Sequence, residues 1–228
     1  MKKLLTLIVI ASLASCSSDD NNGNGGPKKY VTDMIVVQNG DTDTYHFEYD
    51  ANKNITAIER NGDPEFTFTY EGNTIQSVVT NPETGEGIQF VSSGGRITGY
   101  TGVLGEDLSP VSYEPQNNRY TFSEDAIQVT LADRDIARID YYDRQYFSMN
   151  YANAKGPLYS VPTENIFVMT LFTSFYPFLF TRPATSFQYD EVGFTCTNTY
   201  DSDNYLTKMI LEADQGSLYS ITYVYSEM

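Results

Sequence analysis

The feature that most constrains the fold is an alternation of apolar and polar residues that recurs along much of the chain. It is clearest at residues 45–49, 66–70, 127–131 and 219–225. Period-2 alternation places the apolar side chains on one face of a β-strand, and one dry and one wet face is typical of antiparallel sheets. The pattern predicts an all-β domain, an antiparallel meander of about fifteen strands.

Two architectures are predicted for the sheet. It either stays open and curled, or closes into a barrel. The strands are short and their outward faces carry many charges, so any barrel is expected to be soluble and not embedded in a bilayer.

Residues 157–183 interrupt this pattern, and the central sixteen of them carry no charge. Thr163 is suited to cap a helix and Pro177 to end it, which predicts a mid-chain apolar helix or loop. Three roles are open for it: a plug or cover for the sheet, the wall of an apolar pocket, or a surface for a protein partner. Phe172 and Phe175, on the apolar helical face, are the ligand-binding candidates here.

The N-terminus has the form of an export signal. Lys2 and Lys3 precede an uncharged apolar run, which ends in Leu-Ala-Ser followed by Cys16. The run is too short to span a membrane, which needs about 20 apolar residues. The ending resembles a lipobox, so we predict a signal peptide at residues 1–15, cleavage before Cys16, and acylation of Cys16.

Residues 16–29 contain no apolar residue after Cys16 and are predicted to form a flexible tether. Ser18, Asp19 and Asp20 resemble an acidic signal that sends lipoproteins of one Gram-negative phylum to the cell surface. The expected location is therefore the outer membrane, lipid-anchored at the cell surface, with its periplasmic face as the alternative. Residues 30–228 are predicted to form a single domain.

A weak repeat runs through the predicted hairpins: an aromatic residue, any residue, Tyr and often an acid, then a turn and an aliphatic strand. Residues 47–58 and 68–78 fit it best. With the lipobox and the Gly-Pro-Leu-Tyr at residues 156–159, this pattern resembles a family of exported bacterial lipoproteins of unknown function. The resemblance implies Tyr-Asp-type hairpin repeats and a porin-like β-fold, and it implies no activity.

The net charge of the chain limits the classes of partner that it can bind. The formal net charge is −16, and loss of Lys2 and Lys3 with the signal makes it −18. Such a chain repels nucleic acid, so no nucleic-acid partner is expected. A sugar or peptide with positive charge, or a divalent cation, remains compatible with the net charge.

Catalytic motifs are missing from the sequence. It contains one histidine, His46, and after acylation of Cys16 one free cysteine, Cys196. There is no nucleophile elbow, zinc motif, phosphate loop or dinucleotide fingerprint, so no metal, no cofactor and no enzyme activity are expected. Paired carboxylates of a glycosidase stay open, because sequence does not give their separation.

Residues 141–146 are the clearest candidate for a polar ligand-binding surface. The side chains of adjacent tyrosines point to opposite faces of a strand. One of the two therefore faces either solvent or a second layer of protein structure. Tyr142, Arg144 and Tyr146 combine rings with polar groups, as sugar-binding surfaces do, although ordinary cross-strand packing also explains them.

Together these features predict a membrane-anchored surface lipoprotein that acts as a non-catalytic binding or accessory module. Its ligand would be a glycan, a peptide or a hydrophobic molecule. The alternative is a structural or adhesive module that contacts another protein, such as one of the outer membrane, and a carboxylate-based glycosidase ranks third.

Overall fold

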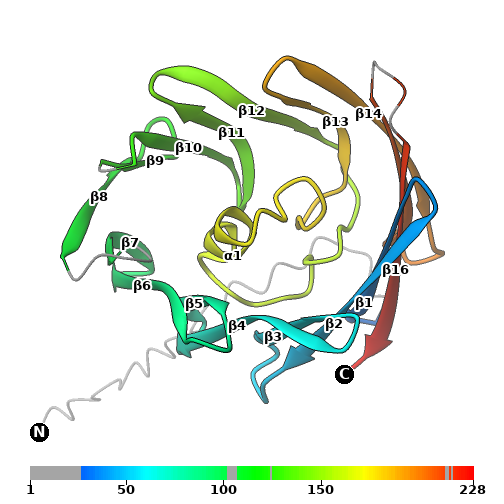
Figure 1. The fold of residues 1–228 in the computed structure, drawn as a ribbon, viewed down its shortest axis with the longest axis horizontal. Helices are drawn as coiled ribbons and strands as arrows, with labels where there is room; N and C mark the ends of the chain where they lie inside the picture. Colours follow the sequence, from blue (N-terminus) through cyan, green and yellow to red (C-terminus); the bar gives the residue numbers. More distant parts are fainter. Residues whose placement is uncertain (1–26, 102–106, 124, 214–215, 217) are drawn as a thin grey trace, which may run out of the picture.

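The protein is a closed antiparallel barrel in which every strand pairs with its neighbours in the sequence (Figure 1). The computed structural model describes residues 27–101, 107–123, 125–213, 216 and 218–228. The described residues form sixteen strands, and β1 (Lys29–Gln38) pairs with β16 (Leu218–Glu227) to close the wall. The predicted meander is confirmed, and of the two predicted architectures the chain adopts the barrel.

The other fourteen strands complete the wall in chain order. They are β2 (Asp41–Tyr49), β3 (Ile55–Arg60), β4 (Asp63–Glu71), β5 (Thr74–Asn81), β6 (Glu86–Ser93), β7 (Arg96–Thr101), β8 (Leu108–Glu114), β9 (Arg119–Phe122), β10 (Ile127–Ala132), β11 (Asp135–Tyr141), β12 (Arg144–Tyr151), β13 (Ala184–Tyr189), β14 (Val192–Tyr200) and β15 (Leu206–Ala213).

The wall is apolar inside and polar outside. Phe47, Phe68 and Phe147 are buried against the interior, whereas Thr195 and Thr197 of β14 alternate with half-buried neighbours and are exposed. Barrels that cross a membrane have the reverse arrangement, with an apolar band toward lipid. Alternation therefore places this core within the barrel and its hydrogen-bonding side chains in water.

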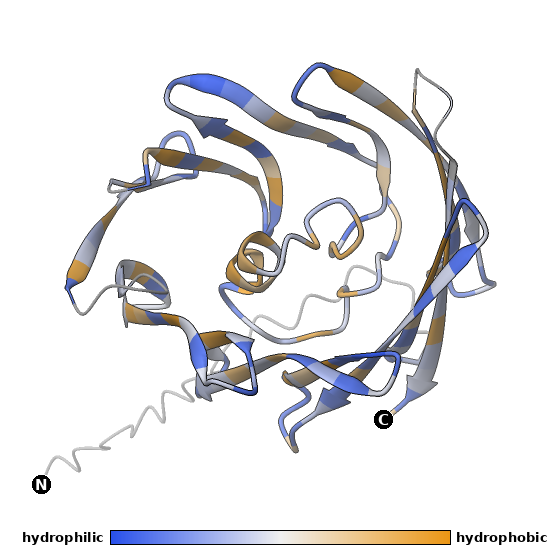
Figure 2. Cartoon of the chain, viewed as in Figure 1, coloured by the Kyte–Doolittle hydropathy of each residue, from blue (hydrophilic) through white to orange (hydrophobic). Residues whose placement is uncertain are grey.

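The lumen is filled by residues 152–183, which connect β12 to β13. An eight-stranded barrel is narrow enough for wall side chains to fill, but one with sixteen strands leaves a central space. The short helix α1 (Ile166–Phe172) occupies that space (Figures 1 and 2). Its residues Val168 and Met169 are fully buried. The structure shows the first of the three predicted roles, and we call residues 152–183 the plug. Several of its residues from 171 to 178 also line the cavities described below, which is the second predicted role.

The helix differs from its prediction in start and length. Asn165 is the N-cap residue and makes no side-chain capping bond, so the prediction that Thr163 caps the helix is wrong. The Thr163 hydroxyl donates instead to Oδ1 of Asn54, 3.1 Å away. Helix α1 ends at Phe172, five residues before Pro177.

Antiparallel topology divides the hairpin turns between two ends. Turns that follow even-numbered strands, together with both connections of the plug, lie at one end, which we call the closed end. Turns that follow odd-numbered strands lie at the other, which we call the mouth.

Buried polar side chains attach the plug to the closed end. The side-chain amide of Asn165 forms two hydrogen bonds with the backbone of Ile75. It accepts from the N–H at 2.8 Å and donates to the carbonyl. Arg134 donates at 2.7 Å to the carbonyls of Val161 and Thr163. Because these groups are paired inside the protein, the plug is held in one position at little desolvation cost.

Two closed-end turns with the predicted Asp-Asn chemistry have the same hydrogen bonding. The carboxylate of Asp50 accepts from the backbone N–H of Asn54, and that of Asp201 accepts from Tyr205, both at 2.9 Å. The fourth residue of each turn, Lys53 or Asn204, has a positive φ of 69° or 67°. The acid thus closes a turn whose backbone would otherwise lose ladder hydrogen bonds.

The tyrosines of the weak repeat cap β-bulges. In each case a Tyr near the end of an even-numbered strand donates its hydroxyl to a carbonyl of the preceding strand, at the residue before a bulge. The pairs are Tyr49 with Val31, Tyr70 with Ile55, Tyr151 with Ile136, and Tyr225 with Leu206, at 2.6–2.7 Å. A bulge interrupts the ladder, so the tyrosine supplies the donor that the neighbouring strand does not.

Tyr49→Phe is therefore expected to lower the free energy of unfolding by about 1–2 kcal/mol, because the buried carbonyl of Val31 loses its donor. Urea unfolding of residues 27–228 measures the change. Tyr159→Phe, at a ring that is 48% exposed, is the control and is expected to stay near wild type. Equal losses in the two variants would contradict the capping role.

The predicted signal peptide, Cys16 and the first part of the tether lie outside the described residues. Within the described part of the chain, no helix is long and apolar enough to cross a membrane.

Candidate functional site

The mouth is the end of the barrel at which the plug leaves space. The tip of the plug, residues 174–178, lies beneath the mouth-end residues of β10–β16 and forms cavities with them. The helix ends there because Ser174 takes a positive φ of 60°, which turns the chain back toward the wall.

The largest of these cavities has a volume of about 520 Å³, within the usual range for small-molecule sites. It lies between the plug tip and strands β10–β13. Its lining is Ile127, Ile139, Tyr141, Tyr146, Leu171, Ser174, Tyr176, Pro177 and Tyr189. Aliphatic and aromatic carbon dominates this lining, and tyrosine and serine hydroxyls supply its few polar groups.

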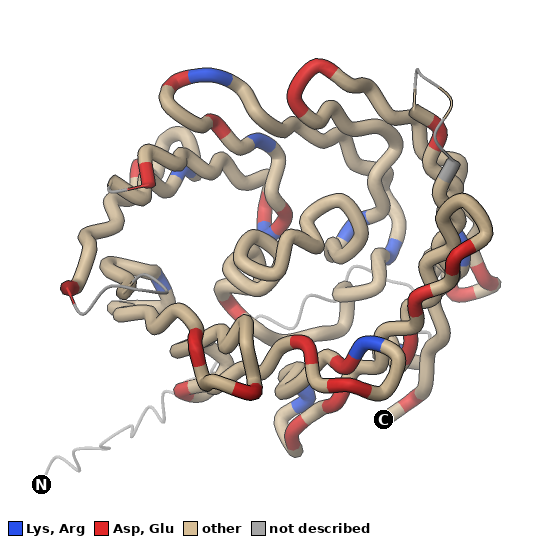
Figure 3. The backbone as a smooth tube through the Cα atoms, in the orientation of Figure 1, with Lys and Arg blue, Asp and Glu red and all other residues tan. Residues whose placement is uncertain are grey.

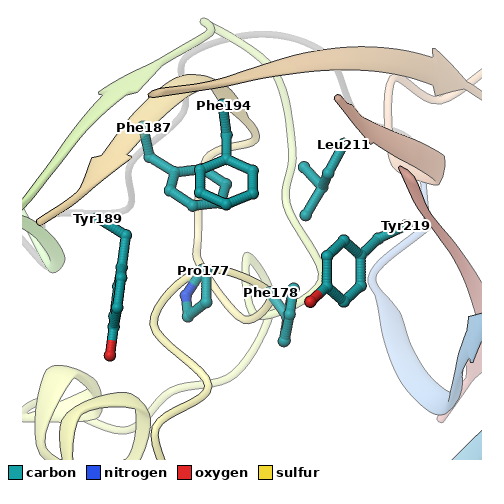
Figure 4. Close-up of a pocket in the computed structure, with 7 residues that line it drawn as sticks. All are labelled: Pro177, Phe178, Phe187, Tyr189, Phe194, Leu211 and Tyr219. Atoms are coloured by element: carbon teal, nitrogen blue, oxygen red, sulfur yellow. The ribbon is translucent and has the colours of Figure 1, made fainter. Parts of the chain in front are cut away.

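A second, smaller cavity of about 190 Å³ adjoins the first. Figure 4 shows the residues that line it. Its lining is Pro177, Phe178, Phe187, Tyr189, Phe194, Leu211 and Tyr219. The rings of Phe187 and Phe194 stack with centroids 4.5 Å apart and form one wall. Pro177 and Tyr189 line both cavities, so the two are neighbours along the mouth.

Tyr189 lies between the two cavities, and two tyrosines of the first cavity contact it. Its ring lies parallel to that of Tyr176 at 6.5 Å, and its hydroxyl hydrogen-bonds to the hydroxyl of Tyr146. That bond raises the pKa of Tyr146 to about 12, and burial raises the pKa of Tyr176. These phenols stay neutral near pH 7 and act as hydrogen-bonding groups.

Polar pockets continue the mouth at both ends of the aromatic cavities. At one end, Arg144 lies with Tyr141 and Tyr146 in a rim pocket, and its guanidinium is 2.7 Å from Asp190. At the other, Gln38 donates to the hydroxyl of Tyr219 at 2.6 Å and joins the second cavity to a polar pocket.

This polar pocket, of about 420 Å³, is lined mainly by β1–β3. It contains Asp41, Asp43 and Arg60, and the guanidinium of Arg60 lies 2.9 Å from Asp43. The Arg60 guanidinium and the Asn61 amide hold the pKa of Asp43 below its usual value. The four pockets form an arc along the mouth, from β3 through β16 to β10, which we call the mouth crescent.

The five residues predicted to bind a ligand divide between the mouth and the core. Arg144 and Tyr146 line the mouth crescent, and Tyr142 stands on its rim with 69% of its surface exposed. Phe175 is buried against wall aromatics, and Phe172 packs on Phe90 and Phe122. Neither phenylalanine lines a described cavity.

Sequence reasoning missed Tyr189, Tyr219, Phe187 and Phe194. Their sequence signals are period-2 alternation and, for Phe187 and Tyr189, the weak repeat, and both signals are shared with core residues. Their convergence depends on how the sheet closes and on where the plug tip stops.

His46 and Cys196 line none of the four pockets of the mouth crescent. His46 is on the outer wall, 2.9 Å from a carboxylate oxygen of Asp33. Burial raises the pKa of Cys196 to about 12, which leaves its thiol protonated and unreactive. Among the residues that the structure describes, no group of three His, Cys, Asp or Glu side chains is placed to hold a metal ion.

The fold and the site define an antiparallel barrel with an apolar interior, a plug inserted from one end and an aromatic mouth at the other. No protein-family model and no curated protein matches the chain. Among solved structures, it is similar to a porin-like protein from Bacteroides uniformis, with 11% identity and a TM-score of 0.51, over 86% of this chain and 98% of that one.

A porin-like protein from Bacteroides vulgatus has 13% identity and a TM-score of 0.49, over 88% of this chain and all of the other. The Bacteroides uniformis likeness shows a shared barrel fold.

Proposed function

We propose that this protein is a non-catalytic binding module that takes the apolar part of a ligand into the mouth crescent. The observation that carries the proposal is the pair of connected aromatic cavities above a plug that fills the rest of the lumen. Concave, largely apolar sites with a few placed hydroxyls are typical of ligand binding. Tyr189, shared by both cavities, is the central contact.

The alternative, a structural or adhesive module, would use exposed apolar surface. The most apolar segment of the chain is the plug, and its helix is buried inside the barrel. The segment is therefore unavailable to a partner protein, whereas the cavities around its tip open to solvent at the mouth. This observation favours ligand binding over adhesion.

The anchor proposed at Cys16 would hold the domain by its closed end. The first strand begins there, and the Nζ of Lys29 lies 2.7 Å from Asp201 and 2.5 Å from Asp203. A Gly-rich tether of fourteen residues reaches about 20 Å. With acylation of Cys16, this attachment would direct the mouth away from the outer membrane, so ligands would arrive from the surrounding medium.

Binding is tested with N-phenyl-1-naphthylamine, a neutral apolar fluorophore whose emission rises in dry sites. We expect saturable binding to residues 27–228, which contain the whole barrel. Tyr189→Ala removes a wall of both cavities and is expected to weaken the affinity about tenfold. Tyr159→Ala, at an exposed tyrosine of the closed end, is the matched control and should change the affinity less than about twofold.

Equal affinities of wild type and Tyr189→Ala would contradict the proposal. A thermal-shift screen with oligosaccharides, peptides and fatty acids extends the test to natural ligand classes. A ligand at 100 times its dissociation constant adds about 2.7 kcal/mol to the stability, which such a screen detects.

A further inference from the structure

The two ends of the barrel carry very different charge. For each end we counted its turns and the three strand residues on either side of them; the closed end also includes the plug, the start of β1 with the residues before it, and the end of β16. Among the described residues, the mouth has fourteen acidic side chains and two basic ones, whereas the closed end has ten acidic and nine basic. Figure 3 shows acids in the β13–β14 turn and an acid beside an arginine in the β11–β12 turn. The net negative charge of the chain is thus concentrated at the mouth.

Both basic side chains of the mouth are already paired. Arg60 forms an ion pair with Asp43 at 2.9 Å, and Arg144 lies 2.7 Å from Asp190 and 3.2 Å from Glu191. Asp41 lines the polar pocket and is paired with no base in the described part of the chain. An anionic group at the mouth would therefore meet a surplus of carboxylates, and a cationic group would neutralise some of them.

Exposed tyrosine rings accompany these carboxylates. Tyr141, Tyr142 and Tyr189 are 47%, 69% and 38% exposed and stand in or beside the turns that carry Asp143 and Asp190. The face of an aromatic ring attracts a cation, and carboxylates near a low-dielectric wall strengthen that attraction. The rim thus offers two kinds of cation-attracting group beside an apolar cavity.

We infer that the ligand of the mouth crescent is a cationic amphiphile, with its apolar body in the aromatic cavities and its positive charge at the acidic rim. The inference rests on the proposed function and adds the ligand's chemical class. Charge complementarity selects the partner, because an anionic amphiphile with the same apolar body would be repelled. A peptide with apolar and basic residues and a small alkyl amine share this chemistry.

Displacement of the fluorophore by three decyl-chain probes tests the charge preference. The probes are decyltrimethylammonium, decyl maltoside and decanoate, each below its critical micelle concentration. We expect the cation to bind at least about tenfold more tightly than decanoate at low salt, with the neutral probe between them. Added salt should narrow the difference, since exposed charges are screened.

A charge-neutralised variant tests whether the preference for a cation arises from the acidic side chains of the mouth. Asp41→Asn, Asp143→Asn and Glu191→Gln, combined, remove three exposed mouth charges and should weaken decyltrimethylammonium binding about fivefold. The matched control combines Glu48→Gln, Glu71→Gln and Glu227→Gln, three exposed acids of the closed end. It changes the net charge equally and should alter the affinity less than about twofold.

Equal affinity for the three probes, or equal losses in the two triple variants, would overturn the inference. If the fluorophore and decyl maltoside still bound and Tyr189→Ala still weakened them, the proposed function would stand and only the charge selection would fail. A decapeptide of leucine and lysine, compared with one of leucine and glutamate, separates the two sources of ligand. Tighter competition by the lysine peptide than by decyltrimethylammonium would identify a peptide.

Discussion

Phe175→Ala is expected to lower the free energy of unfolding by about 3–5 kcal/mol, the usual cost of removing a buried phenylalanine ring. Phe175 is 7% exposed, and its ring meets Tyr45 at 5.1 Å and Phe66 at 5.6 Å in edge-to-face contacts. It joins the plug tip to β2 and β4. The cavity left by alanine would lie between the plug and the wall, where closed strands cannot collapse to fill it.

Urea unfolding of residues 27–228 measures this loss, with Tyr142→Ala as the control. Both variants remove an aromatic ring that was a candidate for ligand binding, but Tyr142 is exposed, and its truncation should cost less than about 1 kcal/mol. A Phe175→Ala variant of wild-type stability that no longer bound the fluorophore would contradict the packing role. It would return Phe175 to the binding site.

Asp135→Ala is expected to cost about 2–4 kcal/mol, because it leaves several buried donors without an acceptor. The Asp135 carboxylate accepts from the backbone N–H of Thr181 at 2.6 Å, from its hydroxyl at 2.7 Å, and from Nε of Arg182 at 3.2 Å. Arg182 keeps its contacts with Ala132 and Asp133, which places the loss below that of a fully buried pair. This cluster fixes the return of the plug to the wall.

The pH dependence of stability tests the same carboxylate. Burial raises the pKa of Asp135 above its ordinary value of 3.8, although hydrogen bonds from Thr181 and the charge of Arg182 oppose this. A folded-state pKa above the unfolded one means that the folded protein binds more protons in between. Stability should therefore fall as the pH rises from 3.8 through the raised pKa.

Asp135→Asn removes this titration while keeping the shape of the side chain. The unfolding free energies of wild type and variant are measured across that pH window. As the pH rises, the value for wild type should fall relative to the value for Asp135→Asn. Two curves that stay parallel would show that Asp135 has the same pKa in both states.

Much of the wall was predictable from local pattern. In residues 45–49 the side chains that alternate toward the core are those that the structure buries or half-buries, because the two faces of a strand follow directly from its pleat. The same applies to the acid of each Asp-Asn turn, whose hydrogen bonds are made within five residues. Interactions this local need no knowledge of the rest of the chain.

The mouth crescent was only partly predictable. Residues 141–146 suggested a polar and aromatic surface, and Arg144 and Tyr146 do line it. Phe172 and Phe175 looked like pocket residues because an apolar helical face is the same in sequence whether it lines a cavity or packs against a wall. The neighbouring Leu171, Tyr176 and Pro177 line the cavities instead.

The sequence by itself determined the strands, their inward and outward faces and the place of the one segment that is not strand, since each depends on residues close in the chain. Tertiary structure alone decided closure, the entry of the plug from one end, and the gathering of Tyr146, Tyr189 and Tyr219 at the other. These residues come from three hairpins. Their proximity, and the separation of charge between the two ends, exist only once β1 pairs with β16 and the connections between strands divide between two rims.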